Sequence, residues 1–292
     1  MKKNALFITF LLSIFFISCD EDFFTTTIEV DPPEHSPRLV VHAFNTDFLT
    51  IVAQISKSTA VGDFGTFGVE RYIYDATAKI YKNGNFLADM QVVASPDNLN
   101  EFNYSAQLPG AITPNDIYTI EVEHPSYPTV RANSSMIPGT EIISTAYVID
   151  GGLDDTGSER SAVDIRFNDP ENQVNYYEVS ITEGGNSVTY ASSLDPSTSR
   201  SLYDNSVIIS DASFNGEEKI LRLQIGRSEN PDRKIELIWR TITEIQYQYS
   251  KSMRQTFDLG DNPFASPVQI PSNVDGGFGF FGLMEIQRIT VQ

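Results

Sequence analysis

The chain is poor in the residues that form covalent and metal crosslinks. Its 292 residues include one cysteine, one tryptophan and three histidines. A single cysteine cannot form a disulfide within one chain. None of His35, His42 and His124 has a partner at metal-ligand spacing, so we expect no zinc site, and we interpret His42 as a half-buried, hydrogen-bonded residue. The fold must therefore depend on its hydrophobic core, for which 40% apolar residues are sufficient.

Positive charge is scarce as well. The chain has 20 Lys and Arg against 39 Asp and Glu, a formal net charge of −19. Such a surface repels phosphate backbones and anionic lipid headgroups, so nucleic-acid binding is not expected.

Motifs for catalysis are lacking. The sequence has no Gly-x-Ser-x-Gly elbow and no phosphate-binding loop. Paired carboxylates for glycoside hydrolysis cannot be nominated, because the many acidic residues offer too many pairs. The sequence predicts no catalytic residue and no cofactor, and we expect a protein that is not an enzyme.

A hydrophobic run long enough to span a bilayer is also missing. Ala5–Ser18 is apolar but shorter than the roughly 20 residues that a spanning helix needs. It follows Lys2-Lys3 and ends at Cys19, which predicts a signal peptide over residues 1–18. Phe16-Ile17-Ser18-Cys19 resembles a bacterial lipobox, so we expect Cys19 to carry lipid that anchors the mature chain. The alternative is an ordinary signal peptide with an incidental cysteine.

An acidic cluster, Asp20-Glu21-Asp22, follows this cysteine. It resembles the surface-export signal of Bacteroidota lipoproteins, and otherwise it is a solvated tether. Residues 19–37 are acidic and contain proline, which predicts an extended spacer between lipid and fold. The expected location is the outer membrane, lipid-anchored and exposed at the cell surface.

Period-two alternation dominates the rest of the chain. Tyr118–Glu123 and Ile235–Trp239 alternate apolar and polar residues, and Asn83-Gly84 is typical of a hairpin turn. These patterns predict an all-β, mainly antiparallel protein with two β-sandwich modules, over residues 38–138 and 139–292. Part of the first module, Ala76–Pro138, resembles immunoglobulin-like or transthyretin-like domains.

One segment has helical periodicity. Residues 243–257 contain neither proline nor glycine, and every fourth residue is apolar. We predict one amphipathic helix there, with Thr241 and Glu244 as a capping box. The expected role of its stripe is core packing against the second sheet, and a ligand-binding aromatic stripe is the alternative. The stripe consists of Ile245, Tyr249, Met253 and Phe257.

The glycine- and phenylalanine-rich tail is the most distinctive stretch. Its aromatic side chains could contact a ligand or partner, or fill a core after a tight turn, with Phe278 and Phe280 pointing inward. The candidate contact residues are Asn262, Phe264, Asn273, Phe278, Phe280 and Phe281.

An acidic loop is a weak calcium candidate. Asp150, Asp154, Asp155 and Glu159 supply carboxylates close together, but their spacing does not match an EF-hand. A solvated loop is the expected alternative, and we predict no metal.

Several of these motifs together resemble a known family. They are Cys19-Asp20-Glu21-Asp22, Pro37–Val41, Ile55–Ser58, Phe167–Pro170 with Asn175–Tyr177, and the tail from Asn262 to Gly282. They resemble the domain-of-unknown-function 4249 family of Bacteroidota outer-membrane lipoproteins. The resemblance implies a surface lipoprotein often encoded near TonB-dependent transporters, and it carries no catalytic residues.

The predicted function is therefore binding without chemistry. We expect an accessory component of a TonB-dependent nutrient uptake system, with the membrane and the transporter as partners. The alternatives are an adhesive or structural surface protein and, less in keeping with the sequence, a surface hydrolase.

Overall fold

The computed structural model describes residues 34–60, 71–93, 102–188, 191–202, 205–230, 233–260 and 266–291. All of the strands and the helix named below belong to one compact unit, Ser36–Thr59 with Asp63–Gln292, and only that unit is described further. The predicted signal peptide, Cys19 and the acidic cluster lie outside the described residues, as do Asn262 and Phe264. No helix in the described part of the chain is long and apolar enough to cross a membrane.

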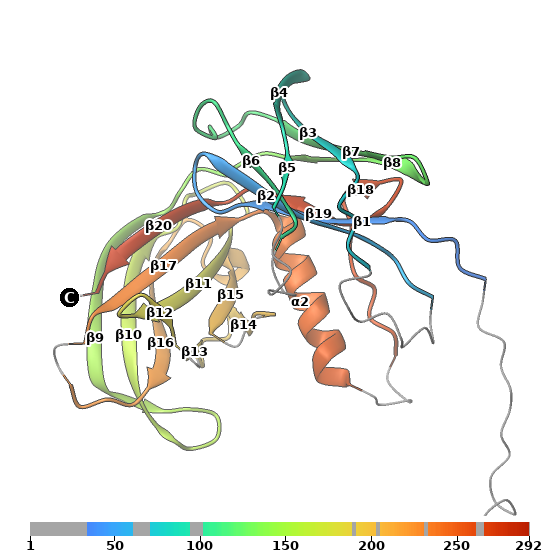
Figure 1. Cartoon of the computed structure of the whole chain (residues 1–292). Coiled ribbons are helices and arrows are strands. Elements are labelled where there is room, and N and C mark those ends of the chain that lie inside the picture. Colours follow the sequence, from blue (N-terminus) through green and yellow to red (C-terminus); the bar gives the residue numbers. More distant parts are fainter. Residues whose placement is uncertain are drawn as a thin grey trace, which may run out of the picture. The chain divides into compact units, whose positions relative to one another are not determined.

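The all-β prediction is confirmed, and most of the pairing is antiparallel. Two sheets with strand orders β19-β1-β2-β6-β5 and β18-β8-β7-β3-β4 form the first sandwich. Sheets β13-β16-β10-β9 and β14-β15-β11-β17-β20 form the second sandwich (Figure 1).

The strands of the first sandwich come mostly from the N-terminal half of the described chain. They are β1 (Leu39–Asn45), β2 (Thr50–Lys57), β3 (Thr77–Lys82), β4 (Asn85–Asp89), β5 (Gln91–Val92), β6 (Tyr104–Gln107), β7 (Tyr118–His124), β8 (Tyr127–Ser134), β18 (Val274–Asp275) and β19 (Phe278–Gly282). The predicted hairpin joins β3 to β4, where Asn83 and Gly84 both have positive φ, 50° and 79°.

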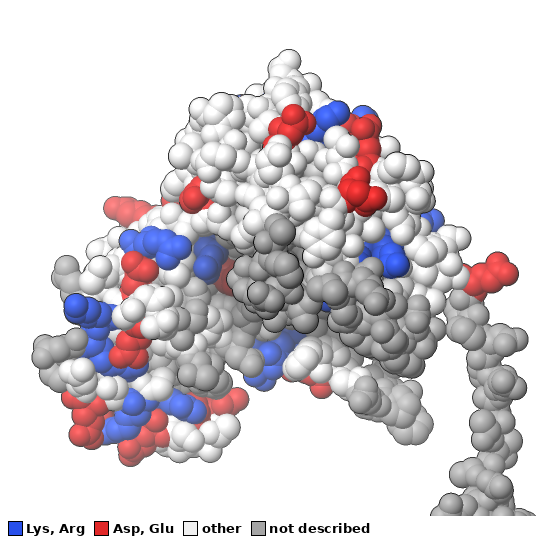
Figure 2. All heavy atoms as spheres, viewed as in Figure 1, with Lys and Arg blue, Asp and Glu red and all other residues white. Residues whose placement is uncertain are grey.

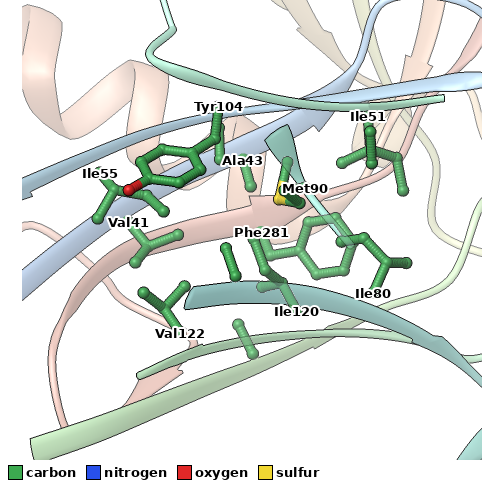
Figure 3. Packing of buried hydrophobic residues seen from close by; sticks show 14 of the residues in the cluster. Val41, Ala43, Ile51, Ile55, Ile80, Met90, Tyr104, Ile120, Val122 and Phe281 are labelled. Carbon is green, nitrogen blue, oxygen red and sulfur yellow. The ribbon is translucent and has the colours of Figure 1, made fainter. Parts of the chain in front are cut away.

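One apolar core lies between these two sheets. Figure 3 shows Val41 and Ile55 from one sheet packing with Ile120 and Val122 from the other, beside Phe281. All five side chains are fully buried. Burial of side chains of this size supplies most of the free energy that holds a disulfide-free sandwich together.

The second sandwich follows in sequence and has its own core. Its elements are β9 (Glu141–Leu153), β10 (Glu159–Asn168), β11 (Tyr176–Glu183), β12 (Asn186–Ser187), β13 (Ala191–Ser192), β14 (Thr198–Arg200), β15 (Ser206–Ser210), η3 (Asp211–Ser213), β16 (Glu218–Gly226), β17 (Ile235–Ile242), α2 (Glu244–Leu259) and β20 (Glu285–Thr290). At its centre the ring of Trp239 lies 4.7 Å from Phe167 and 4.9 Å from Tyr177, centroid to centroid. The single tryptophan is thus a core residue.

The C-terminal segment differs from the predicted domain boundary. Residues 139–292 were expected to form the second module, but β18 pairs with β8 and β19 pairs with β1, both in the first sandwich. The β1–β19 pair is parallel, so the chain leaves the second sandwich, completes the first and returns as β20 beside β17. The two modules are therefore interleaved in sequence.

The predicted helix is confirmed as α2, with a different start and a different face. Its N-cap is Thr243, whose backbone N–H donates to Gln246 Oε1 at 3.2 Å, rather than the expected pair Thr241 and Glu244. The predicted apolar stripe is not buried as core, because Phe257 is 75% exposed. Tyr247 is the aromatic side chain that the helix buries. The helix contacts β19 of the first sandwich and β11, β14 and β15 of the second.

Candidate functional site

A cavity of about 770 Å³ lies where the two sandwiches meet helix α2. We call it the junction cavity. Its walls are the non-core face of the β19-β1-β2 sheet, the non-core face of the β15-β11-β17 sheet, and one side of α2. The two sheets are each backed by a separate hydrophobic core, so these two walls are rigid.

The first wall arises from strand alternation. Val41 and Ala43 of β1 point into the core, which places His42 between them on the opposite face. His42 pairs with Gln54 of β2 on one side and with Phe280 of β19 on the other. An amide, an imidazole and a phenyl ring thus form a row across this wall.

Three aromatic rings meet at the end of this row. Tyr249 from α2 lies 5.2 Å from His42 and 4.7 Å from Phe280, and His42 lies 5.7 Å from Phe280, all between ring centroids. A hydrogen bond of 2.9 Å joins the Tyr249 hydroxyl to His42 Nε2. Burial lowers the pKa of His42, a hydrogen bond with Gln54 partly offsets this, and nearby Arg71 lowers the pKa further. The imidazole is therefore neutral at pH 7.

The second wall carries polar side chains on a sheet whose other face is core. Arg240 of β17 donates from Nη1 to Ser180 Oγ of β11 at 2.9 Å. Ser206 of β15 donates from Oγ to Glu178 Oε1 at 3.1 Å. Glu178 is the register partner of Arg240, yet within the described residues the two form no ion pair.

An apolar cluster closes one side of the cavity. Tyr247 of α2 packs with Ile208, Ile242 and Met284, and its ring lies 4.7 Å from that of Tyr176. Met284 belongs both to this cluster and to the cavity lining. The cluster fixes α2 against the second sandwich and gives the cavity an apolar end.

The lining is basic although the chain is acidic. Lys57, Arg71 and Arg240 line the cavity together with a single carboxylate, that of Glu178. Figure 2 shows red and blue side chains next to one another at the lower left of the visible face. Ion pairs of the second sandwich include those of Arg166 with Glu218 and of Arg222 with Asp164. The cavity lacks this balance of charge.

The tail residues proposed as contacts occupy three different environments. Phe280 lines the cavity. Phe281 is fully buried in the first core. Phe278 is 44% exposed, with the Arg38 guanidinium 5.8 Å from its ring centroid. The alternative of Phe278 and Phe280 pointing into the core is wrong by one residue, because the strand buries Phe281 instead.

Asn273 has a structural position. Its amide donates to the backbone oxygens of Phe281 and Asn133 at 2.9 and 3.1 Å, and its Oδ1 accepts from the Phe281 N–H at 2.9 Å. The side chain, which directly precedes β18, thus joins β19 to β8, and it does not line the cavity.

The carboxylates of the acidic loop form hydrogen bonds and ion pairs with neighbouring protein groups. Asp154 accepts hydrogen bonds from Thr156 and Ser158 and pairs with Arg160 at 2.6 Å, which holds the pKa of that carboxyl well below its usual range. Asp150 and Glu159 both pair with Arg227, at 3.2 and 3.0 Å. Across the residues that the structure describes, no group of three or more His, Cys, Asp or Glu side chains is placed to hold a metal ion.

Sequence reasoning missed most of the cavity. Gln54, Ser180 and Arg240 were not nominated, and Tyr249 and Met253 were expected in the core. One signal in the sequence could have found the first three. The strands that bear these residues are strongly apolar at the positions facing the core and carry polar residues at the positions facing away from it. His42, interpreted as half-buried and hydrogen-bonded, is both, but it also lines the site.

Comparison with known families gives one match. The family model described as Domain of unknown function (DUF4249) matches residues 25–290, nearly the whole chain, so the predicted family is confirmed and the chain belongs to it. None of the curated proteins compared with the chain matches it.

Proposed function

We propose that this DUF4249 protein is a lipid-anchored outer-membrane protein that holds a small organic ligand in the junction cavity without chemically changing it. The observation that carries the proposal is the cavity itself, about 770 Å³ in volume. Sites for small molecules and cofactors are typically about 300–1,000 Å³ and combine apolar walls with a few polar groups.

The construction of the cavity favours binding. Many of its polar groups, among them His42, Ser180 and Arg240, lie on strands whose opposite faces pack in the two hydrophobic cores. A site that is already formed loses little conformational entropy when a ligand binds. The neutral His42, held by Tyr249, is suited to hydrogen bonding and stacking.

The location and the biological role belong to the same proposal. Lipid on Cys19 would hold the domain at the outer membrane, with residues 19–37 as a spacer and Asp20-Glu21-Asp22 as the export signal. Tethering raises the local concentration of a captured nutrient near a TonB-dependent transporter. The immunoglobulin- or transthyretin-like character of the first sandwich is also part of this proposal.

The test compares two variants of one helix in the full-length, lipidated protein. Met253 lines the cavity, whereas Gln255 is exposed two residues later. We expect Met253→Trp to fill the cavity and Gln255→Trp to leave it open. The proteins would be purified from native membranes in mild detergent, and bound small molecules and proteins identified by mass spectrometry.

The expected result is a small molecule that accompanies the wild type and Gln255→Trp but not Met253→Trp, with a TonB-dependent transporter also recovered. Growth on defined nutrients should be impaired by Met253→Trp alone. If Met253→Trp neither releases a ligand nor impairs growth, while thermal unfolding shows it folded, capture in this cavity is wrong. An adhesive role would then be the one to pursue.

A further inference from the structure

The cations at the cavity differ in their pairing from most arginines of the second sandwich. Most arginines of that sandwich hold a carboxylate at 2.6–3.4 Å: Arg160, Arg166, Arg222, Arg227, Arg233 and Arg288. Lys57, Arg71 and Arg240 at the cavity form no ion pair with a carboxylate among the described residues. The chain has a net charge of −19, so carboxylates are abundant, yet none of the described ones pairs with these three cations.

The three cations line the cavity from both sandwiches. Lys57 ends strand β2 and Arg71 precedes Tyr72, which bridges to Ser56 of β2, so both belong to the first sandwich. Arg240 projects from β17 of the second. Like charges that share one cavity repel each other, and Glu178 offsets only one of them. A bound anion would relieve that repulsion.

Arg240 has donors to spare. A guanidinium carries five N–H donors, and within the described residues the hydrogen bond of Arg240 is the one to Ser180 Oγ, at 2.9 Å. That bond orients the planar group on the wall. A planar fork of donors fits an oxyanion in two-point geometry.

The other side chains that line the cavity indicate the chemistry of the uncharged part of the ligand. The rings of His42, Tyr249 and Phe280, together with Met253 and Met284, offer stacking and apolar surface. A small inorganic anion would leave this surface unused and would fill little of the cavity. A neutral molecule would leave the cations without a partner.

We infer, resting on the proposed function, that the junction cavity binds an organic oxyanion. This is a molecule with an aromatic or otherwise apolar body and one negatively charged oxygen-bearing group. Arg240, with Lys57 and Arg71, holds the charged group, and the cluster of His42, Tyr249 and Phe280 contacts the body.

A pair of dyes tests the charge directly. 8-Anilinonaphthalene-1-sulfonate is an aromatic oxyanion, and N-phenyl-1-naphthylamine has the same skeleton without the sulfonate. We expect the anionic dye to bind the full chain one to one and at least about tenfold more tightly than the neutral dye, the factor that a charge-assisted hydrogen bond supports. Fluorescence titration measures both dissociation constants.

Single variants test which cations account for the preference for the anionic dye. Arg240→Gln should weaken the anionic dye about tenfold and leave the neutral dye unchanged, and Lys57→Gln repeats the test at the other wall. Arg166→Gln, which removes an equal charge from the exposed pair with Glu218, should change neither dye. Met253→Trp should abolish binding of both.

The outcomes separate the two proposals. Equal affinity for both dyes, or an anionic dye that tolerates both Arg240→Gln and Lys57→Gln, overturns the oxyanion inference and leaves capture in the cavity standing. Binding of neither dye, or binding that survives in folded Met253→Trp, overturns the use of the cavity itself.

Discussion

The two faces of the β19-β1-β2 sheet come from the same strands and differ in almost every property. On one face, Val41, Ile55 and Phe281 are fully buried in the first core. On the other, His42 and Phe280 line the junction cavity. Adjacent residues along a strand point to opposite faces, so each short strand contributes to both.

This difference teaches that stability and binding can be changed separately at neighbouring positions. A core side chain contributes through burial and close packing, whose loss cannot be replaced by water. A cavity side chain is already partly in contact with solvent space, so its removal costs little folding free energy. The following predictions test that separation, beginning with the largest expected change in stability.

The largest difference in stability is expected between alanine variants of the neighbouring residues Phe281 and Phe280. Phe281→Ala should lower the free energy of unfolding by about 3–5 kcal/mol, because it leaves a phenyl-sized void in a fully buried site. Phe280→Ala should cost about 1 kcal/mol, because the side chain is only half-buried. Urea denaturation followed by circular dichroism measures both values.

Binding should show the reverse order. Anionic dye affinity should fall for Phe280→Ala and stay at the wild-type value for Phe281→Ala wherever that variant is folded. Equal losses of stability in the two variants would mean that the two faces of β19 are not distinct.

Gly279 tests the backbone that holds the two faces in register. It has φ +107°, and a Cβ there would collide with the backbone of Val41 on the parallel partner strand. Gly279→Ala should therefore destabilise the protein by about 3 kcal/mol, through strain and partial loss of the β1–β19 pairing. Thermal and urea unfolding measure the change.

Gly110 supplies the control, because nothing lies within 4 Å of a Cβ built there. Gly110→Ala should change the free energy of unfolding by no more than about 0.5 kcal/mol. A Gly279→Ala variant as stable as Gly110→Ala would show that the parallel pairing is not needed for the fold.

His42 makes the cavity face sensitive to pH. Burial lowers its pKa in the folded protein, whereas the unfolded chain has the usual value of about 6.5. The unfolded state therefore binds more protons between these values, so stability is complete above about pH 6.5 and is lost as the pH falls toward the folded pKa. The slope reaches at most about 1.4 kcal/mol per pH unit.

Urea unfolding at several pH values between 7.5 and 5.5 measures this loss, and His42→Gln should reduce it. His35→Gln, at an exposed position, should keep the wild-type pH dependence. An unchanged slope in His42→Gln would assign the pH dependence to other groups.

The sequence predicted the core better than the cavity for a physical reason. Apolar alternation indicates which residues are buried, and Ile235, Leu237 and Trp239 are buried as their spacing predicts. The helix was found because its segment lacks proline and glycine. The return of β18 and β19 to the first sandwich was not, because pairing across more than 140 residues leaves no local pattern.

The cavity was hard to predict because its residues come from distant strands. Gln54, Ser180 and Arg240 are ordinary outward-facing polar residues in their own strands, and only the tertiary fold brings them together. Phe280 was nominated for its composition, in a set with the core residue Phe281 and the structural residue Asn273. Composition identified the segment, and the register of β19 against β1 decided the role of each side chain.

Phe278 should show the smallest effect on stability. Its side chain is 44% exposed and contacts Arg38 by a cation–π interaction, which at exposed sites contributes about 0.5–1 kcal/mol. Phe278→Ala should therefore cost no more than about 1 kcal/mol in urea unfolding and should leave dye binding unchanged, since Phe278 does not line the cavity. The exposed ring would then be available for contact with the proposed transporter. Co-purification of the lipidated variant from native membranes checks this, with Phe280→Ala as the comparison. Loss of the transporter with Phe278→Ala alone would assign partner binding to the outer end of β19 and ligand binding to its middle. Full recovery of the transporter would restrict the function of this strand to the cavity.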